Sequence, residues 1–234
     1  PHFAVPEPRI GFLQEALRWW DKWLKGIETG VESDPDYRVY VMDADRPGGF
    51  PSRIEGRWIA DKSWPPGGRK NLLKLHLGAG GILSEAKTKK TKLRVQSPQT
   101  TGMDGGEYCI IWLGPEFPGD QRRDDGASRV FDSAPLPKAI DIVGAPELTL
   151  SFIADKPLAQ VAVRLNQIWP DGAVSRISYH LMNLTHRDSH EKPTELTPGK
   201  RYKVKIKLDD IAWRVPQGHG LRVSLSTTYW PMMW

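Results

Sequence analysis

Apolar positions near the start of the chain repeat at the spacing of one helix face. Steps of three and four residues place side chains on the same side of an α-helix. Pro6 and Pro8 precede the repeat, Gly26 follows it, and Lys22 and Lys25 occupy its last turn, as is typical of helix ends. The pattern predicts one amphipathic helix over residues 11–26. Its apolar positions are Leu13, Ala16, Leu17, Trp20, Leu24 and Ile27.

Three more aromatic residues, Phe12, Trp19 and Trp23, widen this apolar face. A single helix cannot bury such a face on itself, so it needs a second layer. The residues that follow predict no further helix that could supply that layer. We therefore expect a neighbouring domain to cover the face.

After Pro35 the period of the apolar residues changes to two. The clearest case is residues 202–208, where Val204, Ile206 and Leu208 alternate with lysines. Such alternation is typical of an antiparallel strand with one buried and one solvated face. Similar strands are predicted at residues 37–42, 74–77, 108–113, 148–154, 161–165, 174–184 and 221–226.

Turn sequences separate these strands, as in residues 170–172, 197–200 and 216–220. About a dozen short strands with few helices indicate a mainly β chain, a jelly-roll β-sandwich of the galactose-binding-domain-like kind. The polar stretch 96–128, rich in Gly and Asp, is interpreted as a loop or insertion between strands.

Composition and charge limit the classes of partner that this chain is expected to bind. The net charge is +5, but 28 acidic residues are interleaved with 33 basic ones, so nucleic acid is not an expected partner. The densest basic run, residues 85–94, is interpreted as a solvated loop and the polar face of a strand, in preference to a phosphate-binding patch. No run of about 18 apolar residues predicts a membrane span. Cys109 is the only cysteine, so no intrachain disulfide forms and the redox compartment stays open.

Few side chains are candidates for a metal-binding or cofactor-binding site. His186 and His190 flank Asp188, but this segment is a polar loop with no third ligand, and we predict no metal. His180 and His219 are interpreted as packing or surface histidines. The glycine-rich residues 77–82 lack the Lys-Ser/Thr of a phosphate-binding loop and predict a turn, so no cofactor is expected.

The chain has 10 tryptophans, and six of them permit two interpretations. Exposed indoles stack on flat sugar faces, and jelly rolls serve as lectin domains, so a carbohydrate-binding module is one alternative. A sandwich that packs on a partner domain also needs Trp at the interface and in the core, and we favour this interpretation. The six are Trp58, Trp64, Trp112, Trp169, Trp213 and Trp230.

A series of sequence blocks carries a resemblance to a known family, in order along nearly the whole chain. The blocks are IGFLQEALRWWDKWLKGIETGV, YRVYVM, GRWIADKSWPP, FDSAPLPKAIDIVGAPELTLSFIADKPLAQVAVRL, WPDGAVSRIS, NLTHR, LTPGKRYKVKIKL and GHGLRVSLS. Together they resemble the C-terminal region of the CocE/NonD hydrolase family, although residues 78–128 match only weakly. This family includes cocaine esterase, α-amino acid ester hydrolases and X-prolyl dipeptidyl-peptidases.

The resemblance implies an α/β-hydrolase with a Ser-His-Asp triad, a helical cap and a C-terminal jelly roll. Such a parent hydrolyses esters, amides or X-Pro peptides through an acyl-enzyme. This sequence has no G-x-S-x-G turn and no G-P-W-x-H block. His2 falls beside the position of the catalytic histidine rather than on it. We therefore assign no catalytic residue to this chain.

The resemblance also predicts two domains. Residues 1–36 would be the last helix of the hydrolase domain, and residues 37–234 a jelly roll that ends before the sandwich is complete. Trp19, Trp20, Trp23 and Trp64 are the predicted interdomain interface. The expected partner is the chain's own hydrolase domain, with a second copy of the chain as the other partner considered. Without a signal or membrane segment, the cytoplasm is the favoured compartment.

Overall fold

The computed structural model describes residues 6–49, 53–64, 72–106 and 117–234. The predicted strand at 108–113, with Cys109 and Trp112, lies outside the described residues, as does His2. The described chain is mainly β, as predicted. Its helices are α1 (Phe12–Lys25) and α2 (Arg122–Gly126); its strands are β1 (Tyr37–Met42), β2 (Gly56–Asp61), β3 (His76–Leu77), β4 (Leu83–Ser84), β5 (Arg129–Asp132), β6 (Ile140–Gly144), β7 (Glu147–Ile153), β8 (Gln160–Ile168), β9 (Val174–Asn183), β10 (Arg201–Lys207), β11 (Ile211–Val215) and β12 (Gly220–Ser226).

Helix α1 confirms the predicted helix. It ends because Gly26 adopts the left-handed conformation, with φ 70°. The Gly26 N–H donates to the Lys22 carbonyl and the Ile27 N–H donates to the Asp21 carbonyl, each at 3.1 Å. The bond from Gly26 to Lys22 is that of the αL cap motif, and glycine adopts the left-handed conformation of this cap without steric cost.

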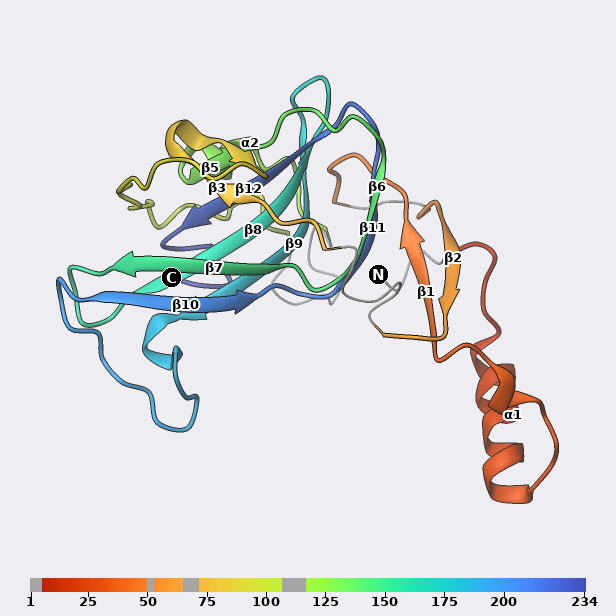
Figure 1. Ribbon diagram of the computed structural model, residues 1–234. Coiled ribbons are helices and arrows are strands. Elements are labelled where there is room, and N and C mark those ends of the chain that lie inside the picture. The colour runs from red at the N-terminus through yellow and green to blue at the C-terminus, as the bar shows by residue number, and fades with distance from the viewer. Residues whose placement is uncertain (1–5, 50–52, 65–71, 107–116) are drawn as a thin grey trace.

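Two layers of strands enclose the main core (Figure 1). One layer is the sheet β5-β12-β8-β9, and the ribbon β10-β7 lies across the core from it. In the ribbon, Val204 faces Leu150 and Ile206 faces Leu148 in register, and these side chains point inward. The intervening lysines are exposed, so the predicted alternation is confirmed. Buried members of the core include Val163, Leu165, Ile206, Val215, Leu221 and Leu225.

Strands β1 and β2 form a hairpin beside the sandwich, within the sheet β2-β1-β11-β6. The hairpin joins this sheet through one parallel pairing, Met42 with Trp213. Tyr40 and Ile54 form a small second core of their own, separate from the main one. Figure 1 shows α1 projecting from this side of the molecule, away from the sandwich.

The long stretch 96–128 is more than a loop. Within its described part, α2 packs on the sandwich, and Gln121, Asp124 and Asp125 are buried. The basic run 85–94 is exposed, as predicted, but it forms no strand, so that part of the interpretation is wrong. Its central residues 87–92 are all lysine or threonine and offer no apolar side chain to bury.

The remaining differences between the predicted and the observed strands concern short elements. Strands β5, β6 and β11 have four or five residues, too few for a period to stand out. Residues 79–81 form the predicted turn, between β3 and β4. Among the described residues, no helix has the length and apolar content needed to cross a membrane.

Candidate docking surface

The polar side of α1 is tied to the turn that follows it. Arg18 donates to Glu15 at 2.8 Å and also pairs with Asp34. Lys22 pairs with Glu28 and Glu32, each at 2.8 Å. The bond from Arg18 holds the pKa of Asp34 below its usual value. These pairs set the orientation of the helix relative to residues 28–34.

Within the described residues, the apolar side of α1 is not covered by another element. Trp19, Trp20 and Trp23 are 49%, 53% and 52% exposed, and α1 contains no buried residue. The rings of Trp19 and Trp23 contact each other, with centroids 5.7 Å apart. Burying the exposed half of one indole is worth about 2 kcal/mol. Five further apolar residues are exposed on this helix and just beyond it: Phe12, Leu13, Leu17, Leu24 and Ile27.

Trp64, the fourth predicted interface residue, follows β2 and is 56% exposed. Its ring lies on Tyr37, the first residue of β1, with centroids 4.5 Å apart. Burial raises the pKa of the Tyr37 hydroxyl, with a smaller contribution from the charge of Asp210. In the described part of the chain, the ring partner of Trp64 is Tyr37 rather than an indole of α1. The structure therefore shows two neighbouring aromatic surfaces, one on the helix and one on the hairpin.

Hydrogen bonds attach the segment before α1 to the β1–β2 hairpin. Trp58 Nε1 donates to the Pro8 carbonyl at 2.7 Å, and the Tyr40 hydroxyl donates to the Glu7 carbonyl at 3.4 Å. The two rings also contact edge to face, at 5.3 Å. Helix α1 is thus held between this attachment and the ion pairs on its other end, with its tryptophans outward.

A polar cluster joins the loop after β1 to the tip of the sandwich. Arg46 bonds Asp171 at 2.6 Å and lies over the ring of Trp169 at 4.3 Å. Ser175 donates to the Asp45 carbonyl at 2.9 Å. Since only one parallel pairing links β1 to β11, this cluster helps to set where the hairpin and α1 stand.

His219 lies beneath this cluster and is 8% exposed. Its Nδ1 is 2.7 Å from Gln167 Nε2, while Gln167 Oε1 accepts from Trp213 Nε1 at 2.7 Å. The amide orientation follows from the indole, which only donates, so His219 Nδ1 accepts and the ring is neutral. Burial lowers the pKa of His219, and the nearby charge of Arg46 lowers it further. The predicted packing role of this histidine is consistent with its place.

A buried ionic network attaches α2 to the outer face of the sheet β5-β12-β8-β9. Asp125 pairs with Arg164 at 3.2 Å and with Arg222 at 2.9 Å, and it accepts from Ser224 at 2.7 Å. Arg222 also makes two bonds to Asp132. No local sequence motif predicts this network, because its members are far apart in the sequence.

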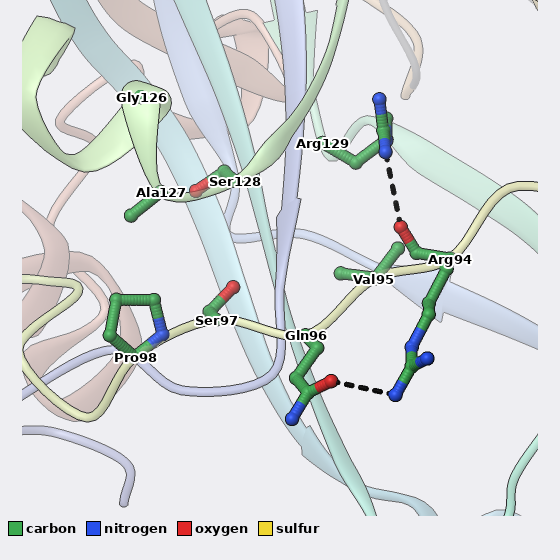
Figure 2. A pocket seen from close by; sticks show the side chains of 9 residues that line it. All are labelled: Arg94, Val95, Gln96, Ser97, Pro98, Gly126, Ala127, Ser128 and Arg129. Carbon is green, nitrogen blue, oxygen red and sulfur yellow. Dashed lines mark hydrogen bonds between the residues drawn. The ribbon is translucent and has the colours of Figure 1, made fainter.

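A shallow hollow of about 400 Å³ lies between residues 94–98 and residues 126–129. Figure 2 shows its polar rim, where Arg129 donates to the Arg94 carbonyl at 3.2 Å and Arg94 donates to Gln96 at 2.8 Å. No histidine, cysteine or carboxylate lines it. Its Ser97 and Ser128 hydroxyls therefore have no neighbouring base in this lining that could activate them as nucleophiles.

The described residues contain no assembled triad. None of their serine hydroxyls is hydrogen-bonded to a histidine ring, the contact on which nucleophile activation rests. His180 lies half-buried in β9, paired with Val163. His186 and His190 lie together in the loop after β9, with their Nδ1 atoms 3.3 Å apart.

The tryptophans considered for sugar binding are distributed over several elements. Trp58, Trp169 and Trp213 are half-buried, and each indole N–H donates to the protein itself. Trp230, which follows β12, is 40% exposed, far along the chain from Trp64. Hydrogen bonding of three of these indoles within the protein favours roles in packing over sugar stacking.

Residues 29–234 match the family described as the X-Pro dipeptidyl-peptidase C-terminal non-catalytic domain. The chain belongs to this family.

Three relatives show how much of a longer protein this family member spans. The chain is 22% identical over 231 residues to cocaine esterase from Rhodococcus sp., covering 94% of this chain and 39% of the esterase. A selenomethionine-labelled α-amino acid ester hydrolase is 20% identical, with a TM-score of 0.64, over 79% of this chain and 34% of that one. A CocE/NonD family hydrolase from Staphylococcus aureus is 16% identical, with a TM-score of 0.64, over 92% and 38%. These matches confirm the resemblance and the fold, and the chain spans little more than a third of each relative.

Proposed function

We propose that this chain is the non-catalytic C-terminal part of a larger serine hydrolase. Its α1 face, with Trp19, Trp20 and Trp23, and the Trp64 surface would dock on the catalytic domain. The family is described as non-catalytic, and the chain covers 39% of cocaine esterase. A domain of this kind stabilises its enzyme by burying apolar surface and shapes the mouth of the active site.

The uncovered face of α1 carries this proposal. Helices of soluble domains usually bury such a face, because most helical stability in proteins comes from that packing. Here the opposite side is paired through Arg18 and Lys22, so the tryptophans cannot simply turn inward without breaking those pairs. A surface held outward with this much exposed aromatic area fits an interface with a second domain.

The same reasoning supports the division into domains. Residues 1–36, with α1, would belong with the hydrolase domain, and residues 37–234 would form the jelly roll. Strand β1 begins at Tyr37, and α1 lies outside the sandwich. The family match begins at residue 29, inside the first of these parts.

The parent reaction we propose is acyl transfer to water from an ester, an amide or an X-Pro dipeptide. The serine nucleophile, its histidine and its acid would lie outside residues 1–234. The reaction would pass through an acyl-enzyme stabilised by an oxyanion hole. This chain would contribute none of the reacting groups.

The direct test is the intact mass of the natural protein, together with its open reading frame. We expect a longer polypeptide that contains G-x-S-x-G and G-P-W-x-H upstream of Pro1. A natural polypeptide without these motifs would contradict the proposal.

A kinetic test complements it. The 234-residue chain should hydrolyse p-nitrophenyl esters no faster than buffer, because it holds no triad. Turnover that persists through repurification would overturn the non-catalytic assignment.

Acrylamide quenching of tryptophan fluorescence tests the proposed interface. Trp19, Trp20 and Trp23 should be accessible in the short chain and protected in the longer protein. Protection in the short chain at high concentration would instead identify a second copy as the occupant.

A further inference from the structure

The loop after β9 brings two histidine rings close together, with their planes tilted by 46°. His186 ends the short helical turn Leu184–His186, and His190 follows four residues later. Their Nδ1 atoms are 3.3 Å apart and their ring centroids 5.3 Å apart. The sequence alone predicted a polar loop here and no metal. It could not show that both Nδ1 atoms converge.

The distance between the nitrogens matches a pair of metal ligands. Two imidazole nitrogens bound to one zinc ion at 2.0–2.1 Å, with a tetrahedral angle between them, lie about 3.3–3.4 Å apart. Neutral imidazole suits zinc, copper and nickel, whereas magnesium and calcium require oxygen ligands. An ion at this position would replace the proton that the two rings now share. The loop therefore has the ligand type and spacing for a borderline-soft divalent cation.

The loop that carries the two rings is braced by its own hydrogen bonds. Arg187 donates to the Thr194 carbonyl at 2.7 Å and to the Thr194 hydroxyl at 2.8 Å, and lies over the ring of Tyr202 at 4.6 Å. Asn183 accepts from the Thr185 N–H at 3.1 Å. Because the backbone is held on both sides of His186, little order has to be gained when an ion binds.

The surroundings decide what kind of site this is. In the described part of the chain, no third His, Cys, Asp or Glu joins the pair. The carboxylate of Asp188, between the two histidines in sequence, is 75% exposed and pairs with Arg187 Nε at 3.2 Å. Both rings are reachable from solvent, since His190 is exposed and His186 half-buried. Two protein nitrogens and open positions for water describe a reversible surface site rather than a closed structural one.

We propose that His186 and His190 chelate one divalent transition-metal ion, with Zn²⁺ or Cu²⁺ as the chemical class. The site does not depend on the docking of α1, because Figure 1 shows the loop after β9 on the far side of the sandwich from that helix. Binding requires both Nδ1 lone pairs, so affinity falls on acidification.

The test is calorimetric titration of the 234-residue chain, without an affinity tag, with ZnCl₂ and separately with MgCl₂. One Zn²⁺ should bind per chain, and Mg²⁺ should not bind. His190→Gln and His186→Gln should each weaken Zn²⁺ binding by about tenfold or more. His180→Gln is the matched control, because it removes a histidine outside the pair, and it should leave the Zn²⁺ affinity unchanged.

A second measurement keeps the result independent of folding defects. Zn²⁺ should raise the thermal midpoint of the wild-type chain and of His180→Gln, but not that of His190→Gln, since only the folded chain presents both rings. Absence of Zn²⁺ binding to the wild-type chain would overturn the proposal. Equal binding by the His186→Gln and His190→Gln variants and the wild type would also overturn it.

Discussion

Helix α1 and the α2 side of the sandwich invert the usual distribution of side chains. On α1, three tryptophans stand about half exposed, whereas beneath α2 the charged Asp125 and Arg164 are almost completely buried. Asp125 pairs with both Arg164 and Arg222, although Arg164 Nε is buried without a hydrogen-bond partner, while the exposed indoles of Trp19 and Trp23 contact each other. The contrast is between an apolar surface that the described residues leave exposed and a charged cluster that they bury. Four comparisons of variants follow from it.

The largest effect is expected beneath α2. Asp125→Ala leaves Arg164 and Arg222 without their shared carboxylate, and loss of one member of a buried ion pair costs about 3–5 kcal/mol of unfolding free energy. Urea unfolding followed by circular dichroism measures it. Asp188→Ala removes an exposed pair and should cost less than about 1 kcal/mol. Equal costs for the two variants would show that the network does not stabilise the fold.

The next comparison uses the same substitution on each side of the contrast. Leu225→Ala, at 4% exposure in the core, should cost about 2–5 kcal/mol of unfolding free energy. Leu24→Ala, at 73% exposure on α1, should stay within about 0.5 kcal/mol in the 234-residue chain. A large loss for Leu24→Ala would mean that this face is already covered, by the sandwich or by a second copy.

A smaller effect is expected from His219, which lies where the hairpin meets the sandwich. Burial lowers its pKa in the folded chain, so below about pH 6.5 the unfolded chain binds more protons and stability falls as the pH decreases. His219→Gln should flatten this part of the pH profile, because glutamine can accept from Gln167 without taking up a proton. Melting curves between pH 8 and pH 5 provide the check. Identical pH profiles for the wild type and His219→Gln would show that His219 does not cause the pH dependence of stability.

The smallest effect concerns the polar side of α1. Arg18→Ala removes the pairs to Glu15 and Asp34, which are partly solvated, so about 0.2–1 kcal/mol is expected. Hydrogen exchange should show faster opening of α1 and of residues 28–34, with β8 unchanged. Lys25→Ala, which loses only one exposed pair to Asp21, is the control. Unchanged exchange in α1 would show that these pairs do not orient the helix.

Much of the fold could be predicted because the sequence period of apolar residues differs between helices and strands. The spacing of apolar residues predicted α1, and alternation with lysine predicted β10, since each pattern lies within the residues of one element. The short strands β5 and β6 carried too few residues for such a signal. The site was partly predictable as well: exposure of Trp19, Trp20 and Trp23 agrees with an interface role, which stays a prediction.

The sequence by itself determined an amphipathic helix, a series of alternating strands and the absence of a nucleophile turn, because these are properties of neighbouring residues. Only the tertiary structure decided which polar side chains are buried and which meet. Asp125 finds Arg164 and Arg222, and Gln167 finds His219, across separate strands. A charged or amide side chain enters the interior only where such distant partners compensate for lost water, and no local pattern records that compensation.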